Sequence, residues 1–192
     1  MNPAHKTDGP IVPVTTIGKA VSRLFLPCLL LLLAACQSLS WQPFSAPDGS
    51  FELLMPGIPI MQTQKTATAF GELEQTIYMT DMGPQAFFIG YTEVDEAARA
   101  GFTDQEILDD FVGRSVTGVG GEVIDFTAAK VEGYPARDVR VAVGEGRETG
   151  VITARFILVE NRVYQLAAIV ADRLVDEEVN ARFLDSFTLL DE

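Results

Sequence analysis

The sequence predicts an α+β fold in which two main helices pack on an antiparallel β-sheet. Segments rich in β-branched and aromatic residues occur in two clusters, with one helical segment between them and a second one near the C-terminal end. The connections within each cluster are short, which favours antiparallel pairing over the long crossovers that parallel strands need. Residues 36–192 show no internal repeat and no low-complexity tract.

The first cluster is predicted to contain four strands. Turns rich in proline and glycine separate segments in which β-forming side chains are frequent. These strands are residues 51–55, 61–70, 72–81 and 85–94, of which the second and third form a hairpin around Gly71. Phe87, Phe88 and Tyr91 in the fourth strand are interpreted as core residues, in preference to a ligand platform.

A capping box begins the first predicted helix. The Thr103 hydroxyl can accept a hydrogen bond from the backbone of Glu106, whose carboxylate reaches back to the Thr103 backbone. Gly118 is the expected C-cap of this helix. Its apolar face consists of Ile107, Leu108, Phe111, Val112 and Val116. A second amphipathic helix is marked by Leu174, Val175, Val179 and Phe183.

The second cluster of strands follows the first helix. The predicted strands are residues 122–130, 136–143, 150–159 and 162–170, with a closing strand at 186–190 after the second helix. Glu160-Asn161 is a tight two-residue connection, and residues 144–147 form a looser one. Both connections predict antiparallel neighbours.

The N-terminal region has the pattern of a signal peptide. Residues 24–35 are uncharged and follow Lys19 and Arg23, but a membrane-spanning helix needs about 20 apolar residues. A buried helix of a cytosolic protein is the alternative, and the five consecutive leucines at 29–33 argue against it because they leave no polar face. Residues 1–23 are long for the basic region that precedes the apolar segment of a signal peptide, so we hypothesise that translation starts near residue 21, from a GTG codon at Val21.

Leu33-Ala34-Ala35-Cys36 resembles the lipobox of bacterial lipoproteins. The resemblance implies that diacylglycerol is attached to the Cys36 sulfur, that the chain is cleaved between Ala35 and Cys36, and that the new amino group is then acylated, with palmitate as an expected acyl chain. Two or three acyl chains give stable membrane anchoring. In lipoproteins of this kind, an aspartate after the cysteine commonly retains the protein at the outer face of the cytoplasmic membrane. This chain has Gln37 there, which favours the outer membrane, with the domain facing the periplasm.

These motifs divide the chain into three parts. Residues 1–35 are the expected lipoprotein signal peptide, 36–45 the lipidated N-terminus with a short tether, and 46–192 the folded domain. Residues 36–192 carry eleven basic and twenty-six acidic side chains, a formal charge of −15. This charge argues against nucleic acid and anionic headgroups as partners, and it indicates an acidic surface that keeps the domain off an anionic membrane.

The residue types present exclude several chemistries. Residues 36–192 contain no histidine, and Cys36 is their only cysteine, so neither a disulfide nor a Ser-His-Asp or Cys-His arrangement can form within them. A zinc site rich in nitrogen and sulfur is excluded for the same reason. We therefore predict no enzymatic activity, no cofactor, and no catalytic, cofactor-binding or metal-binding residue.

Three further motifs receive structural interpretations. Gly118-Val119-Gly120-Gly121 follows a helix, so it is a helix stop and not a phosphate-binding loop. One acidic cluster lies in the first turns of a helix, where carboxylates stabilise the helix dipole. We prefer this interpretation to the alternative, a calcium site. That cluster is Asp104, Glu106, Asp109 and Asp110. Asp176-Glu177-Glu178 is interpreted in the same way.

Four segments, in order, resemble PsbP-like domains. They are Phe51 to Pro59, Gly133-Tyr134-Pro135-Ala136, Arg162-Val163-Tyr164-Gln165-Leu166 and Phe183-Leu184-Asp185-Ser186-Phe187, and the similarity spans Trp41 to Leu190. The resemblance implies an α/β/α sandwich around an antiparallel sheet. It also implies a binding or assembly factor in preference to a catalyst, although no functional residue of the family can be matched here.

Two functions remain open at this level. In the first, a non-catalytic lipoprotein of the cell envelope binds or helps to assemble an envelope protein. In the second, the domain is a small-ligand carrier or a carboxylate-based hydrolase exposed to the periplasm. A pocket with two convergent carboxylates is the feature that would identify the hydrolase. The sequence does not predict the oligomeric state.

Overall fold

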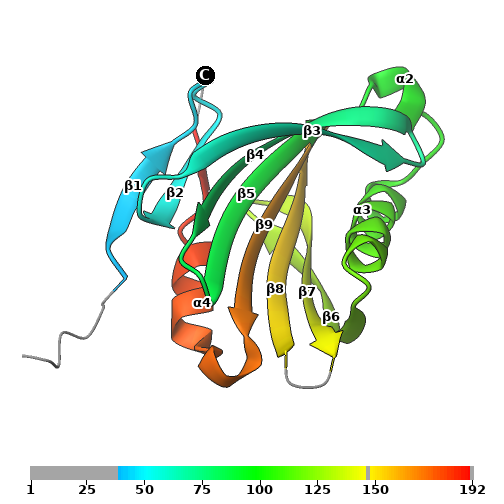
Figure 1. Ribbon diagram of the computed structural model, residues 1–192. Coiled ribbons are helices and arrows are strands. Elements are labelled where there is room, and N and C mark those ends of the chain that lie inside the picture. The colour runs from blue at the N-terminus through cyan, green and yellow to red at the C-terminus, as the bar shows by residue number, and fades with distance from the viewer. Residues whose placement is uncertain (1–38, 146–147, 191–192) are drawn as a thin grey trace, which may run out of the picture. The chain divides into compact units, whose positions relative to one another are not determined.

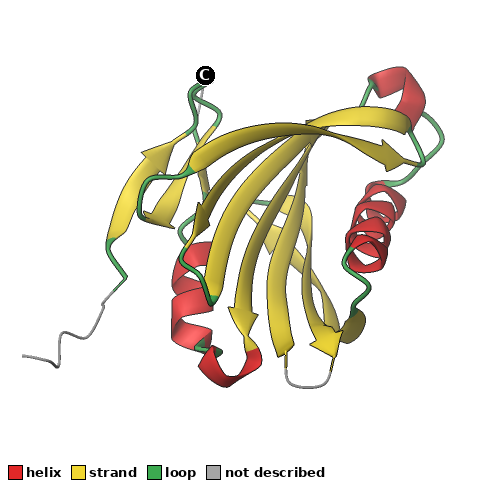
Figure 2. Cartoon of the chain, in the orientation of Figure 1, coloured by secondary structure: helices red, strands yellow, loops and turns green. Residues whose placement is uncertain are grey.

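The main element of the computed structural model is a seven-stranded antiparallel sheet (Figures 1 and 2). The structure describes residues 39–145 and 148–190, so the predicted signal peptide, the Leu33–Cys36 motif and half of the 144–147 connection lie outside it. The strand order is β3-β4-β5-β9-β8-β7-β6. The strands are β3 (Ile60–Thr68), β4 (Gly71–Asp81), β5 (Gln85–Glu93), β6 (Glu122–Val131), β7 (Tyr134–Glu145), β8 (Glu148–Val159) and β9 (Arg162–Ala171).

A second, smaller sheet has the order β1-β2-β10. It consists of β1 (Trp41–Ser45), β2 (Phe51–Pro56) and β10 (Thr188–Leu189). Every neighbouring pair in both sheets is antiparallel, as the short connections predicted.

Helices cover both faces of the large sheet. Helix α3 (Asp104–Gly118) packs on one face, and α4 (Glu177–Leu184) packs on the other face together with the small sheet (Figure 1). The helix α2 (Glu96–Arg99) and the 3₁₀ turn η2 (Asp172–Leu174) are short connecting elements. This arrangement confirms the predicted α+β fold with helices on both sides of an antiparallel sheet.

The face covered by α4 contains an aromatic core centred on Phe51. This side chain is fully buried, and its ring centroid lies 5.7 Å from that of Tyr164 and 5.9 Å from that of Phe187. Phe51 therefore joins β2, β9 and the segment before β10 in one cluster. Burial of such aromatic area contributes strongly to stability.

The opposite face is closed by α3. Its capping box forms as predicted: the Thr103 hydroxyl accepts from the Glu106 backbone, and the Glu106 carboxylate accepts from the Thr103 backbone at 2.8 Å. Ile107, Leu108 and Phe111 project from the first turns and are buried against β7, β8 and β9. The capping box thus fixes where this apolar face begins.

Two hairpins use the backbone conformation that their short turns require. Glu160, in the predicted two-residue connection, has a φ of 52°, and Glu132 and Gly133 between β6 and β7 have φ values of 51° and 90°. Positive φ at the central positions is typical of the turns that match the twist of antiparallel strands.

The structure differs from the sequence predictions at four places. Residues 41–45, assigned to the tether, form β1, because they pair with β2 from Trp41↔Pro56 to Ser45↔Glu52. Gly118 is the last helical residue, not the cap: Val119 is the C-cap, and Gly120 adopts the positive φ of 60°. Leu174 and Val175 precede α4, and the closing strand is shortened to Thr188–Leu189.

The aromatic core predicts the effect of one substitution. Phe51→Ala leaves a cavity between the two sheets, so the free energy of unfolding should fall by about 3–5 kcal/mol in a denaturant titration. The matched control Phe126→Ala removes a ring that is 46% exposed on β6 and should cost about 1 kcal/mol or less. Equal losses in the two variants would contradict the assignment of Phe51 to the core.

Candidate functional site

A cavity of about 470 Å³ lies between α3 and the large sheet. Strands β4, β5, β8 and β9 form its floor, and β3 forms one wall. The floor is mainly apolar, and several of its side chains are only partly covered: Ile77, Met79, Phe88, Ile152 and Ile169. Partly exposed apolar side chains in a concave surface are typical of a ligand site.

The hollow arises because α3 carries smaller side chains towards its C-terminal end. Its first half contributes Leu108 and Phe111, which fill the space above the sheet. Its second half contributes Arg114, Ser115, Val116 and Gly118 to the cavity wall, and of these Ser115 and Gly118 are small. The helix therefore covers one part of this face completely and leaves the rest as a cavity.

Three glutamines form a hydrogen-bonded row across the cavity. Gln64 on β3 donates to the Gln75 side chain at 3.0 Å, and Gln75 on β4 donates to the Gln165 side chain at 3.2 Å. Strand β5 lies between Gln75 and Gln165 in the sheet.

Gly90 on β5 makes this row possible. A Cβ atom at this position would lie 3.2 Å from Gln75 Nε2 and 3.2 Å from the Thr76 carbonyl oxygen. A larger residue would therefore displace the Gln75 amide that spans the strand. The row places uncharged donors and acceptors beside an apolar floor, an arrangement that can orient a bound molecule.

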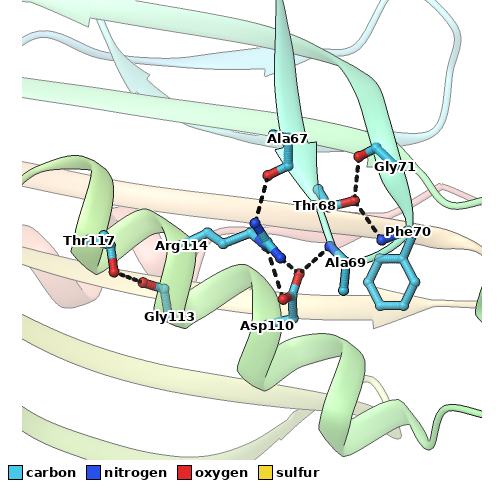
Figure 3. Close-up of polar contacts among 9 residues, drawn as sticks. All are labelled: Ala67, Thr68, Ala69, Phe70, Gly71, Asp110, Gly113, Arg114 and Thr117. Atoms are coloured by element: carbon cyan, nitrogen blue, oxygen red, sulfur yellow. Dashed lines mark hydrogen bonds and ion pairs between the residues drawn. The ribbon is translucent and has the colours of Figure 1, made fainter.

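The tip of the β3–β4 hairpin is fastened to α3 (Figure 3). The Asp110 carboxylate accepts from the Ala69 backbone N–H at 3.2 Å, and the Arg114 guanidinium donates to the Ala67 carbonyl at 3.3 Å. Arg114 and Asp110 are themselves paired at 2.8 Å. We call Asp110, Arg114 and their contacts to residues 67 and 69 the hairpin clasp.

Aromatic packing supports the hairpin clasp. The Phe70 ring stacks on Phe111 with centroids 6.3 Å apart and contacts Phe102 edge-on at 5.0 Å. The Thr68 hydroxyl donates to the Gly71 carbonyl and accepts from the Phe70 N–H, which closes the turn. The clasp and these rings hold the wall of the cavity against the helix.

The cavity lining is electrically neutral. Arg114 is its one charged side chain within the described ranges, and the Asp110 carboxylate compensates it. Hydrogen bonding to Asp110 also raises the pKa of Arg114, which keeps the pair charged at neutral pH. Because neither a free cation nor a carboxylate lines the cavity in the described part of the chain, the site favours an uncharged ligand.

Outside the cavity, pairs of carboxylates converge on the arginines Arg162 and Arg155. Arg162 pairs with both Glu93 and Asp48, the latter at 3.0 Å. Partial burial raises the pKa of Asp48, but hydrogen bonds from Ser50 and Arg162 outweigh it and hold the pKa below its ordinary value. Such pairs are ion bridges that stabilise the fold, because a general acid would need a raised pKa.

A second bridge of this kind joins β8 to the end of α4. Arg155 donates to Asp138 on β7 at 2.7 Å and to Asp185 at 2.9 Å. The two carboxylates share one guanidinium, and their hydrogen bonds raise the pKa of Arg155. This geometry again resembles a structural ion pair and not the acid and base of a hydrolase.

The acidic cluster on α3 has more specific contacts than the sequence predicted. Glu106 completes the capping box, and hydrogen bonds from Thr103 lower its pKa. Asp104 pairs with Arg99, and Asp109 pairs with Arg137 on β7 at 2.8 Å. No group of three potential metal-ligating side chains occurs within residues 39–145 and 148–190.

Two other predictions about motifs can be compared with the structure. Asp176 caps α4 by accepting from the backbone N–H groups of Glu178 and Val179, as expected for an acidic helix start. Phe87 is fully buried on one face, and Phe88 packs against the core cluster of the other face, where it also lines the cavity floor. The two side chains point to opposite faces because they are adjacent on one strand.

The glutamine row was missed by the sequence analysis. The available signals were a glycine inside an aromatic strand, at Gly90, and a polar residue at Gln165 within an apolar strand. A glycine inside a strand often marks a place where another group approaches closely.

Comparison with known proteins identifies the fold. No protein-family model matches the chain, and no curated protein matches it in sequence. The solution structure of cyanobacterial PsbP (CyanoP) from Synechocystis matches with a TM-score of 0.55 and 14% identity, covering 81% of this chain and 95% of that one. The domain therefore has a PsbP-like fold.

Two further structures show lower similarity. LpqN, a protein involved in cell envelope biogenesis of Mycobacterium tuberculosis, has a TM-score of 0.46 and 11% identity, and the match covers 79% of this chain and 91% of that one. A Bacteroides thetaiotaomicron protein has a TM-score of 0.49 and 9% identity over 79% of this chain and 49% of that one. Among the described residues, no helix has the length and apolar character needed to span a membrane.

The hairpin clasp gives a local prediction. Asp110→Ala removes the acceptor of the Ala69 N–H and releases Arg114, so hydrogen exchange at the Ala69 and Phe70 amides should accelerate at least tenfold. Lys65→Ala breaks the exposed Lys65–Glu72 pair in the same hairpin without touching α3 and should leave these amides unchanged. Unaltered exchange in Asp110→Ala would show that the clasp does not hold the hairpin.

Proposed function

We propose that this chain is a non-catalytic, lipid-anchored binding protein of the bacterial cell envelope, and that the cavity beneath α3 is its binding site. The observation that carries the proposal is the neutral lining of the cavity: an apolar floor beside the glutamine row. Its volume of about 470 Å³ lies within the range of small-ligand sites.

The chemistry of the lining specifies the ligand class. Met79, Phe88 and Ile169 are partly exposed, so they favour a ligand with apolar surface. The side-chain amides of Gln64, Gln75 and Gln165 offer hydrogen bonds to uncharged polar groups of the ligand. A charged ligand would lose hydration without gaining an opposite charge. The ligand is therefore uncharged and mainly apolar, with one or more hydrogen-bonding groups.

The location of the protein follows from its N-terminal motif. After cleavage between Ala35 and Cys36, lipid on the Cys36 sulfur holds the domain at a membrane surface. Gln37 favours the outer membrane, and the outer face of the cytoplasmic membrane is the alternative. In this position the cavity is exposed to the periplasm.

An assembly factor is the second candidate function. Strand β6 is an edge of the large sheet, and Val123, Ile124 and Phe126 on it are 46–53% exposed. An envelope protein could add a strand or an apolar surface to such an edge. Crosslinking from this edge in cells that recovers no reproducible envelope protein would remove this candidate. The hydrolase alternative has less support, because the convergent carboxylates described above are bridged by arginines.

The binding proposal is tested with N-phenyl-1-naphthylamine, an uncharged apolar dye whose fluorescence increases in apolar surroundings. Titration into the protein should give a saturable increase in fluorescence. Ile152→Trp places a large ring on the cavity floor and should weaken dye binding at least tenfold, about 1.4 kcal/mol.

The matched control for this titration is Val123→Trp. Val123 lies on β6 outside the cavity and is 46% exposed, so this variant adds the same ring without reducing the cavity. Its dye affinity should equal that of the unmodified protein. Equal affinities in all three proteins would place the dye elsewhere and contradict the assignment of the cavity as the binding site.

The anchor is tested separately through Cys36. In cells fed radiolabelled palmitate, the unmodified chain should carry label, and Cys36→Ala should carry none and should migrate as the longer, unprocessed precursor. Gln37→Ala, next to the modified residue, should still be labelled. Label or processing that persists in Cys36→Ala would rule out lipid attachment at this cysteine.

A further inference from the structure

A strongly exposed apolar segment follows the small sheet. Ile58, Ile60 and Met61 are 84%, 67% and 59% exposed, and they lie at the β2–β3 connection and the start of β3. Met82 is 42% exposed and follows the end of β4. This end of β4 pairs with the start of β3, with Met79 opposite Ile60, so Met82 lies at the same end of the sheet. We call Ile58, Ile60, Met61 and Met82 the apolar rim. Several large apolar side chains grouped at one end of a sheet indicate an interaction surface.

The apolar rim lies beside the point where the chain enters the fold. The Gly57 N–H donates to the Ser40 carbonyl at 3.1 Å, and Trp41 pairs with Pro56, so the residue before Ile58 contacts the start of β1. Leu39 already packs against the aromatic core. Only two residues separate Cys36 from Leu39, and three extended residues span at most about 11 Å.

The chain around the apolar rim is almost free of charge. Residues 39–47, 53–64 and 82–92 contain no acidic or basic side chain, although residues 36–192 as a whole carry a formal charge of −15. The Asp81 carboxylate caps the Met82 turn by accepting from the Gly83 N–H. Ala171 donates its N–H to the Pro84 carbonyl of this turn, and the two residues after it, Asp172 and Arg173, carry opposite charges. This end of the domain can thus approach an anionic surface with little of the repulsion that the rest of the surface would experience.

Trp41 and Arg182 add a second feature typical of a membrane interface. The Arg182 guanidinium lies 5.2 Å from the Trp41 ring centroid, and Trp41 is partly exposed. Tryptophan and arginine are frequent at the level of lipid headgroups, where an apolar ring and a charged group are both accommodated. Trp41 is located five residues after Cys36 in the chain.

We infer that the apolar rim inserts into the headgroup region of the bilayer that holds the anchor, so that the domain lies on the membrane in one fixed orientation. This inference rests on the proposed lipid attachment at Cys36. Lipid is the occupant that the positions favour, because the short connection to Cys36 leaves the rim within reach of the bilayer surface. Strand β1 takes up half of the ten residues, 36–45, that the sequence assigned to the lipidated N-terminus and its tether.

The orientation also connects the membrane with the cavity. Ile60 is the register partner of Met79, which lines the cavity floor, so the apolar rim continues directly into the apolar floor. An uncharged apolar molecule leaving the bilayer at the rim would meet Ile60 and then Met79 on its path to the cavity.

The test uses the single tryptophan of the chain. Trp41→Phe removes it and keeps an aromatic ring against Phe87, with which Trp41 makes an edge-on contact at 5.6 Å. Into this background Ile58→Trp is introduced at the rim, and Phe126→Trp at an exposed position on β6 serves as the matched control. The full chain is produced in cells with palmitate labelling, purified in its processed form and reconstituted into phosphatidylethanolamine–phosphatidylglycerol vesicles containing phosphatidylcholine with dibrominated acyl chains.

The inference predicts that brominated lipid quenches at least half of the emission of the Ile58→Trp protein and less than a tenth of that of the Phe126→Trp protein. Comparable quenching of the two probes would overturn the inference. Absence of quenching in a palmitate-labelled protein that floats with the vesicles would overturn it as well. A protein that carries no palmitate and does not float would overturn the lipid anchor and the orientation with it. Because Ile58 is 84% exposed, its substitution does not perturb the core, and Met82→Trp in the same background provides an independent second position.

Discussion

Both faces of the seven-stranded sheet are apolar, and the rest of the structure follows from the need to cover them. On β5, Phe87 and Ile89 point to one face and Phe88 to the other, and β9 alternates in the same way with Leu166 and Ala167. A sheet of this kind is stable only between two further layers. The small sheet and α4 supply one layer, and α3 supplies the other.

The two layers cover their faces to different extents, and this difference creates the candidate site. The small sheet inserts Phe51, Leu53 and Met55 into a continuous core, so one face is closed. Helix α3 fills the other face only with its first turns, and the remaining area becomes the cavity floor. The hairpin clasp then holds β3 beside the helix, and the charge that Arg114 brings to the lining is compensated by Asp110.

The sequence predicted the elements but not their long-range contacts. The capping box at Thr103, the two-residue turn at Glu160 and most strands were correct, because each depends on residues close together in the chain. Strand β1 was missed, because its proline and polar residues give a weak local pattern and its pairing with β2 decides its conformation.

The site was less predictable than the fold. The Asp110–Ala69 contact joins residues 41 positions apart, and the Gln75–Gln165 contact joins residues 90 positions apart. Neither distance can be inferred from local periodicity. The acidic residues of α3 were correctly assigned to structural roles, but their partners in the β3–β4 turn and on β7 emerged only from the arrangement of the elements around the sheet.

The central claim is that the cavity beneath α3 binds an uncharged apolar molecule beside the glutamine row. Side-chain amide resonances measured by NMR during addition of N-phenyl-1-naphthylamine test it most directly, because Gln75 and Gln165 report from inside the cavity and Gln42 on β1 reports from outside it. The account predicts saturable shifts of the Gln75 and Gln165 amides while the Gln42 amide stays unchanged. Shifts confined to Gln42, or no shifts at saturating dye, would contradict it.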